Sequence, residues 1–163
     1  MTRWQAVHVQ CRRCLSSQDF TSALTYKTPQ MLQSYLHYTQ KNHCSDDVIQ
    51  ADKVGEVTEA LVTYRQLADE ISRAMEPHSL DLAIVWGTIA LLIRNSLSIQ
   101  ERLEKIVEVL SRVRRVMERV LRCIHRHPDE AKEARIAMVD TMGALALILA
   151  ETMKFIHQNG TGI

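Results

Sequence analysis

An apolar repeat between Ile99 and Ile124 constrains the fold of this chain more than any other feature. Its residues follow one another at alternating steps of four and three: Ile99, Leu103, Ile106, Leu110, Val113, Met117, Val120 and Ile124. This spacing places them on one side of an α-helix, in the heptad pattern that coiled coils also use. The sequence therefore predicts a long helix with an apolar face, the heptad seam, that other helices must cover.

Three further long helices are predicted from the rest of the chain. Apolar steps of three and four predict one from Val54 to Met75, which ends because the residue before Pro77 avoids the α region. The second, with Ser79 as its cap, contains the most apolar stretch of the first half, IVWGTIALLIR from Ile84 to Arg94. The third extends from about Asp129 to His157, and we expect it to be buried on most sides because apolar residues surround it. Its apolar positions include Ile136, Met138, Val139, Met142, Leu145, Ile148, Leu149 and Met153.

The N-terminal part predicts shorter elements. Residues 1–28 are expected to form a helix followed by a polar loop that reaches Lys27. Thr28 and Pro29 predict the start of a short helix, because Thr suits the N-cap and Pro the first helical position. Ser45 or Asp46 is expected to cap the next helix. We divide the chain into residues 1–28, a helical-bundle domain at 29–158 and a tail at 159–163.

These elements predict an all-α protein, an antiparallel bundle of four long helices with one or two short N-terminal helices. Gly and Pro are scarce, at 5 and 3 of 163 residues, and 46% of the residues are hydrophobic, which is enough for a core. Inside a helix Gly87 costs about 1 kcal/mol relative to Ala, so we expect a close helix approach beside Trp86. That helix is expected to pack as the hairpin partner of the heptad helix. The predicted core includes Trp86, Gly87, Leu103, Ile106, Leu110, Val113, Met117 and Val120.

A stripe of five arginines lies opposite the heptad seam on the helical wheel. This arginine stripe consists of Arg112, Arg115, Arg119, Arg122 and Arg126. Guanidinium groups on one face can bind the phosphates of anionic lipid, or the acidic groups of a partner. The alternative is an ordinary solvated face, partly neutralised by Glu108 and Glu118 at a spacing of four residues. We do not expect nucleic acid as a partner, because the helix has no aromatic residue for base stacking.

Metal and enzyme sites are weakly signalled. His8, Cys11 and Cys14 follow one another at three-residue spacing and, with Cys44 or His43, could supply zinc ligands. Free thiols are the alternative that we favour, because a second tight ligand pair is missing. The sequence has no Gly-rich phosphate loop, no His-Glu-x-x-His motif and no nucleophile elbow. We therefore expect a protein that is not an enzyme and has no cofactor.

Several features bear on location. The first ten residues lack the apolar region of a signal peptide, so we expect a reducing, cytoplasmic environment. No uninterrupted apolar run reaches the roughly 18–20 residues of a membrane span. The formal net charge is +1, so only a local patch could attract an anionic membrane.

The segments LDLAIVWGTIALLIRNS and ERLEKIVEVLSRVRRVMERV resemble the N-terminal helical domains of fungal STAND proteins. These NLR-like receptors carry such a domain before a NACHT ATPase and WD or ankyrin repeats. The resemblance covers about residues 30–157 and includes Val85-Trp86-Gly87, Val139-Asp140 and Lys154-Phe155. Thr141-Met142-Gly143 departs from the family, which has aromatic residues beside the Asp, and the chain contains no ATPase segment.

The resemblance implies a signalling bundle of the Goodbye-like and HeLo-like groups, associated with immunity, heterokaryon incompatibility and cell death. It supplies no catalytic residues. We expect a module that acts by contact with proteins, including other copies of itself. A second version of this hypothesis adds targeting of anionic membranes. The alternative is a structural oligomerisation or scaffold bundle, in which the heptad helix pairs between chains.

Overall fold

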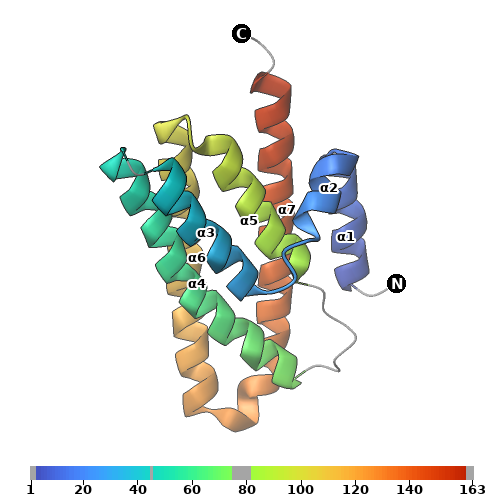
Figure 1. Ribbon diagram of the computed structural model, residues 1–163. Helices are drawn as coiled ribbons and strands as arrows, with labels where there is room; N and C mark the ends of the chain where they lie inside the picture. The colour runs from blue at the N-terminus through green and yellow to red at the C-terminus, as the bar shows by residue number, and fades with distance from the viewer. Residues whose placement is uncertain (1–2, 45, 75–81, 161–163) are drawn as a thin grey trace.

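The computed structural model describes residues 3–44, 46–74 and 82–160, and the element order in these ranges is entirely helical (Figure 1). The elements are α1 (Arg3–Cys14), α2 (Ser17–Ala23), α3 (Pro29–His43), α4 (Val48–Ala74), α5 (Ala83–Ser96), α6 (Gln100–Arg126), the 3₁₀ turn η1 (Pro128–Glu130) and α7 (Ala131–Gly160). The all-α prediction is confirmed. The layout with four long helices is not, because α4, α6 and α7 have 27, 27 and 30 residues whereas α5 has 14.

Local capping chemistry explains three of the helix starts. Thr28 Oγ1 accepts the Met31 N–H at 3.3 Å, with Pro29 at the first position of α3, as predicted. Asp47 Oδ1 accepts the Gln50 N–H at 3.0 Å and caps α4, so the prediction of Asp46 is wrong, and Ser45 lies outside the described residues. Ser79, Glu76 and Pro77 also lie outside them; α5 begins at Ala83, with Leu82 as its N-cap.

The expected polar loop before Lys27 contains a helix. Ser16 Oγ accepts the Asp19 N–H at 3.1 Å and donates to Asp19 Oδ2 at 2.7 Å, which starts α2. The Ser-x-x-Asp spacing is a form of the capping box, so the sequence held a signal for this helix. The signal is weak because α2 has only seven residues and most of them are polar, which is also typical of a loop.

Helix α5 forms the centre of the molecule. Every residue from Ala83 to Ile93 is buried, and Trp86 lies with its ring centroid 6.3 Å from that of Tyr64. Our prediction that this helix pairs with α6 is only partly right, because its contacts with α7 and α2 are more extensive. The Tyr64 hydroxyl donates to the Leu110 carbonyl at 2.8 Å and ties α4 to α6 across the core.

The predicted close approach at Gly87 is present. A Cβ atom at this position would lie 1.9 Å from the Ala23 carbonyl oxygen, a distance that no real contact allows. Glycine at position 87 therefore lets the end of α2 lie directly on α5. Because Ala23 and Gly87 are both small and buried, this contact attaches the N-terminal helices to the core.

The heptad seam is mostly buried, but within one chain. Leu103, Ile106, Leu110, Met117 and Ile124 are buried, as predicted. Val113 and Val120 are only half-buried, and Ile99 is exposed as the N-cap residue. Val107 and Leu121 are buried as well, so the apolar face is wider than a coiled-coil seam. The reason is that α6 packs against both α4 and α7.

The prediction that the last helix is buried on most sides is wrong in part. Met138, Met142, Leu145, Leu149 and Met153 are buried. Ile136, Ile148 and Phe155 are 48%, 57% and 65% exposed. Helix α5, rather than α7, takes the central position, so α7 has α1, α5 and α6 as its main neighbours and keeps an open outer face (Figure 1).

Candidate functional site

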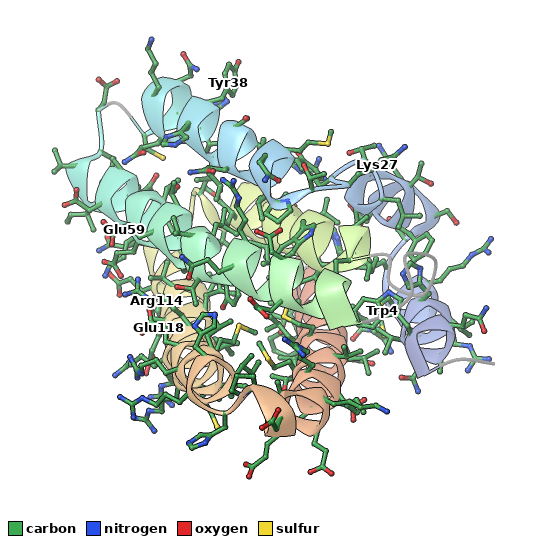
Figure 2. All side chains as sticks on the ribbon, turned by 90° about the horizontal axis from the view of Figure 1, so that it is seen from below. Trp4, Lys27, Tyr38, Glu59, Arg114 and Glu118 are labelled. Atoms are coloured by element: carbon green, nitrogen blue, oxygen red, sulfur yellow. The ribbon has the colours of Figure 1, made fainter. Side chains whose placement is uncertain are left out.

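The arginine stripe lies on the outer face of α6, and all five of its side chains are exposed. Arg112 forms an ion pair with Glu108, one turn earlier, as the sequence spacing suggested. The Arg115 Nε donates to the Ser111 carbonyl at 3.5 Å. Figure 2 shows nitrogen-tipped side chains gathered on this side of α6. The structure therefore places all five side chains of the stripe on one exposed face of α6, with Arg112 neutralised by Glu108.

The second predicted neutralising pair is wrong. Glu118 accepts from Arg114 Nε at 2.9 Å, not from Arg122, and it also accepts from Thr63 at 3.4 Å (Figure 2 labels Arg114 and Glu118). Glu118 is half-buried beside α4, so it faces away from the stripe. Within the described ranges, no ion pair is formed by Arg115, Arg119, Arg122 or Arg126.

The candidate zinc ligands are not brought together. Cys11 is buried with its Sγ 3.8 Å from the Ala146 carbonyl, and Cys14 donates to Glu151 Oε1 at 2.9 Å. The His8 ring packs edge-on to Trp4 and Phe20. Cys44 is buried at the end of α3. In the part of the chain that the structure describes, no group of three or more His, Cys, Asp or Glu side chains could hold a metal ion.

Burial determines the chemistry of the two N-terminal thiols. Desolvation, with a smaller contribution from Cys14, raises the pKa of Cys11 to about 12. Desolvation, the hydrogen bond to Glu151 and the Glu151 charge raise the pKa of Cys14, which Lys154 opposes. Both groups are neutral thiols near neutral pH, so neither is a nucleophile or a ready metal ligand.

An apolar groove lies between the first half of α6 and the last half of α7. It has a volume of about 510 Å³, and α5 closes its floor. Leu92, Ile106 and Leu149 form the buried floor, one from each helix. Ile99, Val109, Ile148 and Phe155 form exposed walls. The structure adds this apolar groove to what the sequence predicted.

Charge at the groove is confined to the α6 edge. Glu101, Arg102 and Lys105 line this edge, whereas the lining residues of α7 are uncharged. Lys105 Nζ lies 2.8 Å from Glu101 Oε1, and Arg102 forms no ion pair with any described residue. The edge therefore has one guanidinium that no carboxylate of the described residues pairs with. Sequence periodicity could not reveal the groove, because it depends on the angle between two helices.

Two buried carboxylates connect the helices elsewhere. Asp19 lies 3.1 Å from His157 Nε2 and 3.5 Å from Arg94 Nη2, and joins α2 to α5 and α7. Glu70 lies 3.3 Å from Arg135 Nη2 and 3.6 Å from His125 Nε2, and joins α4 to α7 and α6. Each carboxylate has one arginine and one histidine partner, from two other helices. These clusters act as connections between elements.

The segment Pro128–Asn159 is long and apolar enough to cross a membrane by length and composition alone. The sequence expectation counted apolar runs, whereas this criterion averages hydropathy over 18 residues and tolerates two charged side chains. In the structure 44% of the most apolar window is buried. The core helix of a soluble bundle meets the same criterion, so the segment is compatible with both roles.

Comparison with known proteins adds no relatives: no family model matches the chain, and no curated protein or solved structure matches it.

Proposed function

We propose that this protein is a non-enzymatic antiparallel helical bundle that acts as a signalling or adaptor module by binding a protein partner. The arginine stripe is its contact surface. The observation that carries the proposal is the set of four exposed stripe arginines that have no ion pair among the described residues. A surface of this kind favours an acidic partner, since unpaired guanidiniums bind carboxylates with two parallel hydrogen bonds.

The resemblance to fungal STAND receptors gives the biological setting. On that basis the module belongs to a cytoplasmic NLR-like immunity or heterokaryon-incompatibility pathway that ends in cell death. Expression of the chain in fungal cells, followed by scoring of cell death and of co-purified proteins, tests the proposal. Arg115→Glu combined with Arg119→Glu should abolish both effects, because it replaces attraction by like-charge repulsion.

A matched control separates this surface from net charge. Lys41→Glu combined with Lys132→Glu makes the same charge change at exposed positions on α3 and α7. It should leave partner binding and cell death unchanged. Equal loss in both double variants, or normal activity of the stripe variant, would contradict the proposal.

A membrane version is the second candidate, favoured by the length and apolarity of Pro128–Asn159. In this version the stripe binds anionic headgroups, and the bundle opens so that α7 can insert. Liposomes with and without anionic lipid test it. Binding that requires anionic lipid and is lost in the stripe variant supports the membrane version, whereas negligible binding to both vesicle types excludes it.

The scaffold alternative has less support. The heptad seam is covered by α4 and α7 of the same chain, so chains that associate must use another surface. Light scattering over a concentration series tests association directly. A monomer at all concentrations would exclude an oligomerisation scaffold and leave the adaptor proposal standing.

A further inference from the structure

The groove between α6 and α7 has the properties of a ligand site. Its volume of about 510 Å³ falls in the range of small-molecule pockets, which are about 300–1,000 Å³ and mostly apolar with a few placed polar groups. Three helices contribute to its floor, so its shape depends on the tertiary packing and not on one mobile element. In Figure 1 the first turns of α6 and the last turns of α7 lie at the same end of the molecule.

The walls of the groove keep large apolar side chains in water. Phe155 and Ile148 are 65% and 57% exposed, and Val109 is 41% exposed on the opposite wall. A ligand that lies between the two walls would cover all three side chains. Each apolar Å² removed from water contributes about 25 cal/mol, so a hydrocarbon chain is a favourable occupant.

The groove is also polarised from one wall to the other. Arg102 and Lys105 lie on its α6 edge, and Arg102 has no counter-ion among the described residues. These residues belong to the first two turns of α6, where the helix dipole is also positive. The α7 wall contributes Ile148, Thr152, Phe155 and Ile156 and no charge.

We infer that this groove binds a single-chain anionic amphiphile, with its hydrocarbon chain between α6 and α7 and its acidic headgroup against Arg102. The chemical class is a long-chain carboxylate or phosphate. It could be a free fatty acid, or one chain of an anionic lipid withdrawn from a membrane. This site is separate from the arginine stripe and does not depend on the function proposed for it.

Charge argues against a second copy of the chain as the occupant. A two-fold contact through the groove would place the walls of one molecule against those of another. Among the lining residues only Glu101 is acidic, and it is already paired with Lys105 at 2.8 Å, so a second copy brings no unpaired acidic group to Arg102. A carboxylate or phosphate headgroup supplies that group directly.

Displacement of a fluorescent fatty acid tests the inference. The purified full chain is titrated with dansyl-undecanoic acid. Laurate competes below its critical micelle concentration, and methyl laurate competes below its solubility limit. We expect laurate to displace the probe and the uncharged ester to bind about ten-fold more weakly, because it loses a charge-assisted hydrogen bond. Phosphatidylcholine vesicles with and without phosphatidic acid distinguish a membrane source from the free acid.

Four variants identify the groove. Ile148→Glu should abolish displacement, and its control Val116→Glu, an exposed valine of α6 outside the groove lining, should leave it intact. Arg102→Glu should weaken laurate binding about ten-fold or more, whereas Arg119→Glu, in the arginine stripe, should not change it. Thermal unfolding followed by circular dichroism confirms that each variant is folded.

Several results would overturn the inference. They are no displacement by laurate, equal binding of acid and ester, and equal losses in Val116→Glu and Ile148→Glu. Concentration-dependent dimers that Ile148→Glu dissociates, without any laurate binding, would show that a second copy covers the groove. Loss of cell death in the stripe variant with normal laurate binding would leave both proposals intact.

Discussion

Gly87 is the residue at which a single added methyl group has the largest expected effect. In Gly87→Ala the new Cβ would overlap the Ala23 carbonyl and force α2 away from α5. Overpacking of this kind costs about 1–3 kcal/mol, more than the gain in helix propensity of about 1 kcal/mol. We expect a lower midpoint of urea denaturation.

The chain supplies a matched control for this prediction. In Gly55→Ala the new Cβ would lie 3.2 Å from Gln40 Nε2, which donates to the Ala51 carbonyl at 2.9 Å and needs to shift by only a few tenths of an ångström. The stability of this variant should be unchanged or up to about 1 kcal/mol higher, because Ala favours the helix. Similar destabilisation by both substitutions would mean that the contact with Ala23 is not the cause.

The Cys11 thiol makes stability depend on pH in the alkaline range. Burial raises its pKa to about 12, whereas an unfolded thiol titrates near 9. Below pH 9 both states keep the proton; between pH 9 and 12 only the unfolded chain releases it, so the free energy of unfolding falls as pH rises. One such group changes stability by at most about 1.4 kcal/mol per pH unit. Urea denaturation from pH 8 to 11 should show a smaller slope for Cys11→Ala than for Cys123→Ala, which removes an exposed thiol.

At the scale of elements, the attachment of α2 depends on the buried Asp19 carboxylate. Asp19→Asn keeps the shape but removes the charge that faces His157 and Arg94. The expected loss is about 1–3 kcal/mol, since a buried hydrogen-bonded charge has been removed from its partners. Hydrogen exchange should accelerate first in α1 and α2 and leave α6 unchanged. Glu108→Gln, which removes an exposed pair, should change neither region.

How far the sequence predicts each element depends on where the information lies. The period of α6 and the Thr28-Pro29 start of α3 are local patterns, and both predictions are confirmed. The central position of α5 depends on how the other helices pack around it. Its mostly apolar run, Ala83–Ile93, was nevertheless a usable signal in the sequence. The groove depends on the angle between α6 and α7, which no spacing within one helix encodes.

At the scale of the whole molecule, the N-terminal helices share the core of the bundle. Trp4 is 6% exposed, and its ring would lie 3.3 Å from a Cβ at Gly143 of α7. Cys11 and Leu15 are buried as well. Since α1 packs along α7 and α2 lies on α5, we expect residues 3–23 and the later helices to unfold together.

The two tryptophans allow a direct measurement of this cooperativity. Trp4 reports on α1 and Trp86 on α5, so the variants Trp86→Phe and Trp4→Phe each leave one probe. Within each variant, the urea midpoint from fluorescence should equal the midpoint from far-ultraviolet circular dichroism, because two-state unfolding gives coincident transitions. A Trp4 transition at lower urea than the circular dichroism of the same variant would mean that α1 detaches first. In that case residues 1–28 would be a separate unit, as the sequence analysis divided the chain. The apolar surface of α7 beneath Trp4 would then be exposed to solvent before the rest of the bundle unfolds.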